Sequence, residues 1–295
     1  MKNVLVTGGA GFIGSHLCEG LLAAGYRVRV LDSLIYGKRE WVPQAAEFIE
    51  GDIRDINACH RATTGMDAVL HCAAMSRSGP SQEHLDLCTQ SNIAGTQNML
   101  LAARDAGVKK FVYSGSSTYY GSRTPPHRES DPPDFLNLYG LTKRVGEQYC
   151  LLFDKDFDLP CIVFRYFNVY GPRQPETGAY ALVLGIFLRR AAERKILEIH
   201  GDGSQRRDFV HVRDIVSANL AALKSPVRGE VFNVGSGTNI SVKELADMIS
   251  PDQVHTEGRK GDSTATLADI SKIKAALNWS PLVSFADGLK ELRAK

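Results

Sequence analysis

Glycine recurs at every third position from Gly8 to Gly14, directly after a short apolar run that begins the chain. Residues 3–7 have the composition of a buried strand, and residues 15–24 have that of a helix. Glycines at 8, 11 and 14 permit a tight turn, close approach of the backbone to a pyrophosphate, and close packing of helix on strand. The helix N-terminus would then face the anion. This spacing predicts a dinucleotide-binding unit at the start of the fold.

A second apolar run, residues 27–31, is followed by Asp32. An acid at this place in a dinucleotide-binding unit accepts hydrogen bonds from the adenosine ribose. Because a carboxylate repels a 2′-phosphate, Asp32 favours NAD over NADP. Lys38 and Arg39 in the next loop keep NADP open as an alternative.

Further strand-like runs occur at residues 47–50, 68–71, 111–114 and 161–165, with helix-period stretches between them. This alternation predicts an α/β fold with a doubly wound parallel sheet, the Rossmann arrangement. The runs are apolar, as expected when helices cover both faces of the sheet.

The alternation breaks after residue 168, which predicts a second, smaller lobe. We expect the dinucleotide-binding domain to comprise residues 1–168 plus about 207–236. The interleaved C-terminal substrate lobe would comprise about 169–206 plus 237–295. Within it we expect a helix over residues 180–194, short strands near 197–200, and a last helix over 285–293.

The composition excludes several classes of protein. A net charge of +2 gives no field suited to nucleic acid. No apolar run approaches the roughly 20 residues of a membrane span, and the first strand begins too early for a signal peptide. Six cysteines without C-x-x-C spacing indicate reduced, buried thiols in a cytoplasmic protein, with neither disulfides nor a metal site.

Tyr139 and Lys143 stand four residues apart, so on a helix the lysine ammonium can lie near the phenol. Lowering the pKa of a tyrosine from about 10 to about 7 requires roughly 4 kcal/mol. A cation at about 5 Å in an effective dielectric of about 20 supplies on the order of 3 kcal/mol, and a bound nicotinamide could supply the rest. Together with the glycine motif, the pair indicates redox chemistry at a carbinol carbon.

The whole chain resembles the extended short-chain dehydrogenase/reductase family, in particular the NAD-dependent nucleotide-sugar epimerases and dehydratases of the UDP-glucose 4-epimerase type. The resemblance rests on motifs distributed in order along the chain: residues 7–14 (TGGAGFIG), 51–55 (GDIRD), 71–74 (HCAA), 139–143 (YGLTK), 165–172 (RYFNVYGP), 201–209 (GDGSQRRDF) and 268–272 (ADISK).

The resemblance implies a catalytic hydroxyl near the end of the strand before the Tyr139 helix. Counting back from residues 120–121 selects Ser116, although Ser117 is close enough to remain an alternative. Dehydratases of the family carry Asp-Glu after this hydroxyl and decarboxylases carry a Glu, whereas this chain has Ser117 and Thr118. The resemblance therefore implies epimerisation at C4 of a UDP-hexose through a transient 4-keto sugar. Alternatives are an NAD(P)-dependent nucleotide-sugar 4-ketoreductase and a non-catalytic dinucleotide sensor.

The resemblance also implies which residues hold NAD. Asp52 and Ile53 should meet the adenine, and Ala73 should line the nicotinamide side of the groove. The remaining cofactor residues by resemblance are Gly8, Gly11, Phe12, Ile13, Gly14, Asp32, Tyr139 and Lys143.

For the substrate, the resemblance assigns phosphate contacts to Asn168, Arg207 and Arg259, and a ribose contact to Asp262. Thr266 stands where the strict UDP-glucose/UDP-galactose enzymes have a tyrosine, which leaves room for an acetamido group and predicts that UDP-GlcNAc and UDP-GalNAc are also accepted. An unusual sequence around Arg77 keeps a uronic acid open. Asn92 is expected to be a structural residue behind the Tyr139–Lys143 pair. The family also implies a homodimer formed through two helices, one of them carrying this pair.

Overall fold

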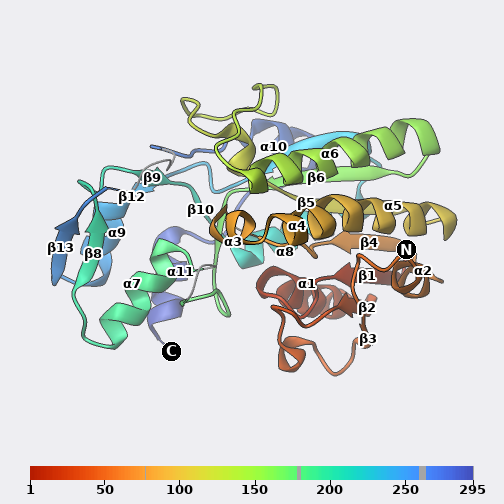
Figure 1. The fold of residues 1–295 in the computed structure, drawn as a ribbon, viewed down its shortest axis with the longest axis horizontal. Coiled ribbons are helices and arrows are strands. Elements are labelled where there is room, and N and C mark those ends of the chain that lie inside the picture. The colour runs from red at the N-terminus through yellow and green to blue at the C-terminus, as the bar shows by residue number, and fades with distance from the viewer. Residues whose placement is uncertain (77, 178–180, 259–263, 295) are drawn as a thin grey trace.

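The computed structural model describes residues 1–76, 78–177, 181–258 and 264–294. Its centre is a seven-stranded sheet with the order β11-β6-β5-β4-β1-β2-β3, in which every pair of neighbours is parallel (Figure 1). The strands are β1 (Asn3–Thr7), β2 (Arg27–Asp32), β3 (Glu47–Glu50), β4 (Ala68–His71), β5 (Lys110–Ser116), β6 (Cys161–Tyr166) and β11 (Glu230–Val234). The doubly wound parallel sheet predicted from the sequence is confirmed.

Helices cover both faces of this sheet. Val4 and Val6 of β1 belong to one buried cluster, while Leu5 between them belongs to another, because successive strand residues point to opposite faces. The first face is covered by α1 (Phe12–Ala23) and α8 (Val212–Lys224), and the second by α2 (Ile56–Thr63), α5 (Gly95–Asp105) and α6 (Leu138–Phe157). In the part of the chain that is described, no helix has the length and apolarity needed to cross a bilayer.

Strand β3, one of the two edge strands of the sheet, differs from the apolar run expected. Its terminal residues, Glu47 and Glu50, are both exposed. An edge strand has a neighbour on one side only, so its side chains can face water. Arg29 on β2 pairs with Glu47 at 2.8 Å.

A smaller apolar cluster lies beside the sheet and includes Leu184, Ile199 and Leu245. It is built from residues of α7 (Val183–Ala192), α9 (Val242–Ile249), α11 (Phe285–Arg293) and β8 (Leu197–His200), together with Tyr170 and Phe209. Strand β8 pairs with β13 (Gln253–Thr256). The late helix α10 (Ser271–Leu277) instead packs Ile273 and Leu277 into a cluster of the large sheet. The domain division at residues 168, 206 and 236 remains a prediction.

The remaining elements are short. They are the paired strands β7 (Asn168–Tyr170) and β10 (Phe209–His211), the paired strands β9 (Arg206–Arg207) and β12 (Ile240–Ser241), helices α3 (Ser78–Glu83) and α4 (Leu85–Thr89), the π-helical turn η2 (Gln90–Ala94), and the 3₁₀ turns η1 (Arg39–Trp41) and η3 (Ser117–Tyr120).

Two predicted helices have different bounds in the structure. The first helix begins at Phe12, three residues early, because Gly11 is the extended N-cap and the end of the glycine motif is already helical. Helix α7 begins at Val183, since Leu182 is still extended, and ends at Ala192 before Arg194 adopts a positive φ of 55°. The last helix spans residues 285–293 as predicted.

Candidate active site

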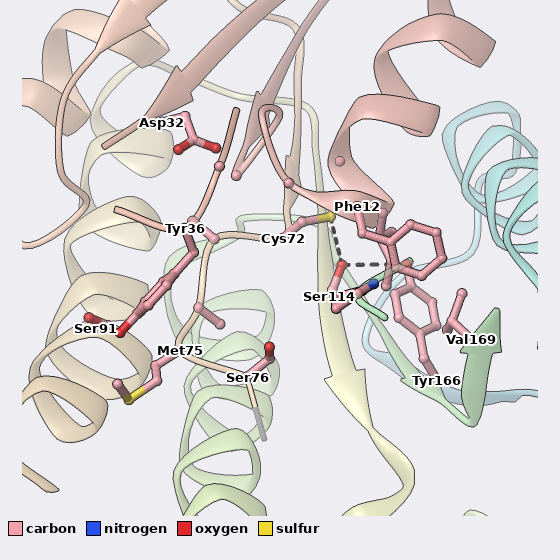
Figure 2. A pocket seen from close by; sticks show the side chains of 18 of the residues that line it. Phe12, Asp32, Tyr36, Cys72, Met75, Ser76, Ser91, Ser114, Tyr166 and Val169 are labelled. Atoms are coloured by element: carbon pink, nitrogen blue, oxygen red, sulfur yellow. Dashed lines mark hydrogen bonds between the residues drawn. The ribbon is translucent and has the colours of Figure 1, made fainter. Parts of the chain in front are cut away.

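The carboxyl ends of six sheet strands open into a cavity of about 780 Å³ (Figure 2). Gly8, Asp32, Ala73, Ser116 and Asn168 line it, and each ends or closely follows a strand. The strand order reverses between β1 and β4, and open α/β sheets bind ligands at such a switch point. Figure 2 shows Asp32 at one end of this cavity and Tyr166 and Val169 at the other.

The glycine motif shapes one wall of the cavity. Gly8 has φ +70°, and a Cβ there would lie 2.8 Å from the Ala73 nitrogen. A Cβ on Gly14 would overlap the Gly8 carbonyl oxygen. The N-terminus of α1 has no side-chain cap, so its first N–H groups remain available to an anion, and this cradle fits the pyrophosphate of NAD. The rest of the motif also lines the cavity: Gly11, Phe12 and Ile13.

Asp32 has both carboxylate oxygens fixed by the backbone. Oδ2 accepts a hydrogen bond from the Ala10 N–H and Oδ1 accepts one from the Leu34 N–H, each at 2.9 Å. Burial raises the pKa of Asp32 despite these bonds. Each oxygen keeps a further lone pair, so the carboxylate can accept ribose hydroxyls, and this contact remains a prediction.

Lys38 and Arg39, the two residues that kept NADP as an alternative cofactor, each place their charged group over an aromatic ring. The Lys38 ammonium is 5.0 Å from the centre of the Trp41 ring, and the Arg39 guanidinium is 4.4 Å from that of Phe48. Lys38 also lines the cavity.

Asp52 and Ile53 line the same part of the cavity. The Asp52 carboxylate accepts a 2.6 Å hydrogen bond from Arg54, and Ile53 is buried against Gly95. The structure therefore gathers all the predicted cofactor residues around one space, and their contacts with NAD remain predictions.

Tyr139 lies in the first turn of α6. The Asn137 side chain caps this helix by accepting a 2.9 Å hydrogen bond from the Gly140 N–H. A Cβ on Gly140 would lie 3.1 Å from the Thr118 carbonyl oxygen, so this turn packs against the segment that follows Ser116. The Thr118 hydroxyl donates to the Ser116 Oγ at 2.9 Å.

Ser116, Ser117, Tyr139 and Lys143 all line the cavity. Lys143 is only 5% exposed, and burial lowers its pKa to about 8. Within the described residues no carboxylate forms an ion pair with it. A protonated ammonium at this place favours the charged form of a neighbouring phenol.

Asn92 holds the elements behind the pair together. Its amide donates to the Thr142 hydroxyl at 3.0 Å and to the Met75 carbonyl at 2.9 Å, and its oxygen accepts from the Met75 N–H at 2.8 Å. Asn92 is buried in the π-helical turn η2. This agrees with the structural role expected of it.

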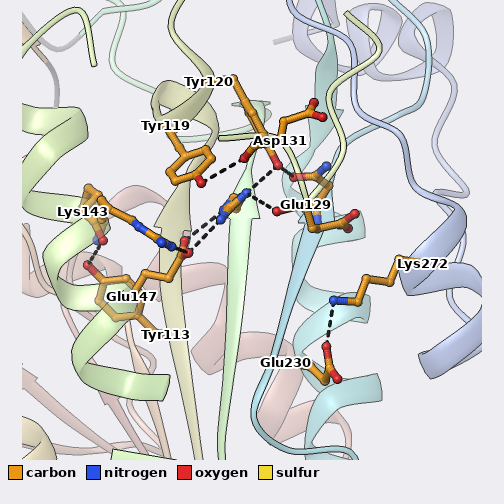
Figure 3. A network of polar contacts seen from close by, with 12 residues as sticks. Tyr113, Tyr119, Tyr120, Glu129, Asp131, Lys143, Glu147, Glu230 and Lys272 are labelled. Atoms are coloured by element: carbon orange, nitrogen blue, oxygen red, sulfur yellow. Dashed lines mark hydrogen bonds and ion pairs between the residues drawn. The ribbon is translucent and has the colours of Figure 1, made fainter. Parts of the chain in front are cut away.

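A second polar network contacts α6 at Glu147, one turn after Lys143 (Figure 3). The buried Arg165 guanidinium donates to both carboxylate oxygens of Glu147, at 2.9 and 2.7 Å, and to the Tyr120 hydroxyl at 2.8 Å. Tyr120 in turn donates to Asn233 at 2.6 Å, and Glu147 also pairs with Arg144. The network ties α6 to β6, β11 and η3.

The predicted substrate residues are only partly brought together. The Asn168 amide donates to the Thr266 hydroxyl at 3.2 Å, and the Thr266 N–H donates to the Arg206 carbonyl at 3.0 Å, next to Arg207. Asn168 lines the cavity, whereas Thr266 and Arg207 are not among the described lining residues. Arg77, Arg259 and Asp262 lie outside the described residues.

Several lining residues were not predicted from the sequence. They include Ile35, Tyr36, Trp41, Cys72, Met75, Leu87, Ser91, Ser114, Tyr166, Arg173, Gln174, Pro175, Glu176, Thr177 and Leu182. Most follow a strand end, which is the one signal that could have pointed to them. Among them, the Cys72 thiol lies 2.9 Å from the Ser114 hydroxyl, which donates to Tyr166 at 3.4 Å (Figure 2).

Comparison with known proteins adds to this geometry. The family model described as "NAD dependent epimerase/dehydratase family" matches residues 4–235. A UDP-N-acetyl-alpha-D-glucosaminuronate decarboxylase of Bacillus cytotoxicus is 35% identical over 98% of this chain and 96% of its own length. A UDP-glucuronate 4-epimerase of Thermodesulfobacterium geofontis is 34% identical over 98% and 94%. The crystal structure of UDP-glucose 4-epimerase from Thermotoga maritima with UDP-glucose superposes with a TM-score of 0.95 at 36% identity, covering 99% of this chain and 97% of that one.

Proposed function

Because the chain belongs to the NAD-dependent epimerase/dehydratase family, we propose that it inverts C4 of a UDP-hexose through a transient 4-keto sugar. The observation that carries this proposal is the convergence of Ser116, Tyr139 and Lys143 on the cavity shaped by the glycine motif. NAD is the cofactor, and when bound it takes up the C4 hydride of the sugar and later returns it.

Residues of the protein accept and return the proton of the sugar 4-hydroxyl. The Tyr139 phenolate accepts the proton of the 4-hydroxyl in the oxidising half of the cycle and gives it back in the reducing half. Ser116, held by the Thr118 hydroxyl, shares the hydrogen bond between sugar and phenol. A positioned acid–base group of this kind contributes about 10² to 10⁴ in rate.

The residues after Ser116 support epimerisation over the other reactions of the family. Ser117 and Thr118 line the cavity with hydroxyl groups, where a dehydratase needs a carboxyl group to protonate a leaving hydroxyl. Without that group the cycle ends when the same carbon is reduced again on its other face.

The substrate is held by the residues assigned to it from the sequence. Asn168 and Arg207, with Arg259, bind the diphosphate, and Asp262 binds the ribose. Thr266 leaves room for a C2 acetamido group, so both UDP-Glc/UDP-Gal and UDP-GlcNAc/UDP-GalNAc are substrates. The names of the relatives make the corresponding uronates the main competing class.

Incubation with UDP-glucose, UDP-GlcNAc, UDP-glucuronate and UDP-GlcNAc-uronate, followed by NMR of the products, tests this proposal. We expect C4 epimers of the two neutral sugars, with no net NADH produced. The Tyr139→Phe variant should abolish turnover while still binding NAD and UDP-sugar. Release of CO₂ from a uronate, without epimerisation of either neutral sugar, would contradict the proposal.

Paired serine variants test the assignment of the catalytic hydroxyl. Ser116→Ala should lower kcat by about 10² or more. Ser117→Ala should leave kcat within a few-fold of wild type. The reverse result would move the role to Ser117.

We further propose that the protein is a cytoplasmic homodimer that associates through α6. Leu141 and Leu152 are exposed on this helix, and their spacing of eleven residues places them on one face. Light scattering after chromatography should give twice the mass of 32.3 kDa. Leu152→Glu should shift the mass to that of the monomer.

A further inference from the structure

Lys143 carries a positive charge into a closed part of the protein without a carboxylate partner among the described residues. A charge removed from water needs compensation from groups around it. The neighbours of this ammonium therefore decide whether it stays charged, and where it lies.

The face of Tyr113 meets the ammonium. Lys143 Nζ lies 4.4 Å from the centre of the Tyr113 ring, and the Tyr113 hydroxyl donates to the Lys143 carbonyl at 3.3 Å (Figure 3). The face of an aromatic ring is negative and attracts a cation, most strongly where water is excluded. Tyr113 is fully buried on β5 and Lys143 is 5% exposed, so water screens this attraction only weakly.

Packing fixes the Tyr113 ring in this position. A Cβ on Gly146 would overlap the Tyr113 hydroxyl oxygen, so α6 rests directly on the end of the ring. The His71 ring stacks on Tyr113, with 5.9 Å between centres and 28° between planes. The ring can move little without displacing a strand or a helix.

The other titratable groups around Lys143 are uncharged or paired elsewhere. Burial lowers the pKa of His71 to about 3 and raises that of Cys72 to about 11. Burial likewise raises the pKa of the Cys88 and Cys150 thiols, and Glu147 is paired with arginines. The phenol of Tyr113 also stays neutral, because burial raises its pKa well above the ordinary value.

We propose that Tyr113 is a positioning residue for the Tyr139–Lys143 pair. Its ring face holds the Lys143 ammonium in the place a carboxylate would otherwise take. A carboxylate would neutralise the ammonium, whereas a ring face fixes it and leaves its positive charge free to act on the Tyr139 phenol. The inference rests on the proposed function only in taking Tyr139 as the base.

Titration of the Tyr139 phenol tests this directly. The phenolate absorbance of the NAD-loaded protein, minus that of the same protein carrying Tyr139→Phe, isolates one tyrosine of the ten in the chain. Tyr113→Leu removes the ring face and should raise the pKa of Tyr139 by about one unit or more. Tyr113→Phe keeps the face and should shift it by less than half that amount. If the role of Tyr113 were purely structural, both variants would be less stable but the pKa of Tyr139 would be unchanged.

Fluorinated phenylalanines at position 113 cover the case in which Tyr113→Leu does not fold. Each added fluorine withdraws charge from the ring face with little change of shape. We expect the pKa of Tyr139 to rise stepwise from phenylalanine through monofluoro- to trifluorophenylalanine. A pKa that is the same across this series would overturn the proposal.

The titration does not depend on turnover. If wild type fails to epimerise any hexose while the fluorinated series still shifts the phenol, the proposed function fails and the role of Tyr113 stands. If wild type epimerises a hexose and the pKa of Tyr139 is the same across the fluorinated series, the proposed function stands and the role of Tyr113 fails.

Discussion

Arg165, which pairs with Glu147 of α6, and Lys143, which belongs to α6, are both buried cations, but their surroundings differ. Arg165 is 2% exposed, and its guanidinium meets both oxygens of Glu147 as well as Tyr120. Although burial opposes it, the pairing with Glu147 raises the pKa of Arg165 above its ordinary value. Lys143 has no such partner in the described structure, and burial lowers its pKa.

This difference distinguishes a buried charge that stabilises the fold from one that is suited to act in the reaction. A fully paired cation is held in a single arrangement and has little effect on its surroundings. An unpaired one stays poised to stabilise an anion, and such groups gather at functional sites. The Arg165 network orders the elements around the base, while Lys143 acts on it.

The largest expected effect comes from removing the carboxylate that pairs with Arg165. Glu147→Gln leaves the Arg165 guanidinium buried without an anion, which should lower the free energy of unfolding by about 3 to 5 kcal/mol. Urea denaturation measures this loss. Glu193→Gln, which breaks the solvent-facing pair with Arg189, is the control and should change little. Equal losses in the two variants would remove the distinction between the two cations.

Removing the charge of Lys143 should change the free energy of unfolding in the opposite direction. Lys143→Met removes a charge whose burial is unfavourable, so the variant should be more stable than wild type by about 1 to 3 kcal/mol at pH 7. It should also lose activity, because the Tyr139 phenol returns toward its ordinary pKa. Thermal unfolding without bound sugar, together with the NMR assay, checks both outcomes.

The pH dependence of that stability difference has a defined sign. The pKa of Lys143 is about 8 in the folded protein against an ordinary 10.5, so between these values the unfolded chain binds more protons. Wild type should therefore gain stability relative to Lys143→Met as pH rises through this window. A difference that stays constant from pH 7 to 10.5 would show that Lys143 titrates normally.

The smallest effect concerns a neutral contact beside Lys143. Thr142→Val removes the hydroxyl that accepts from the Asn92 amide, which should cost about 1 kcal/mol because that amide keeps its bond to Met75. Thr142→Ser retains the hydroxyl and should cost less. A loss as large as that of Glu147→Gln would mean that neutral bonds, and not the ion pair, hold α6.

The sequence predicts what local geometry determines. The turn from Gly8 to Gly14 and the placing of Tyr139 and Lys143 on one helix follow from spacing alone, and both lie in the predicted site. The hydrogen-bond partners of the Arg165 side chain, Glu147, Tyr120 and the Glu129 carbonyl, come from three separate segments. Tyr113 is 30 positions from Lys143. Such contacts depend on how β5, β6 and α6 pack together, which no periodicity encodes.

The side chains of strand β3 affect whether molecules of the protein associate edge to edge at high concentration. As an edge strand of the sheet, it offers an edge onto which another chain could hydrogen-bond. Its exposed Glu50 would meet the carboxylates of an approaching β3 edge, and their repulsion opposes such pairing. Residues that make β3 a poor apolar run thus help to keep the protein from aggregating at high concentration.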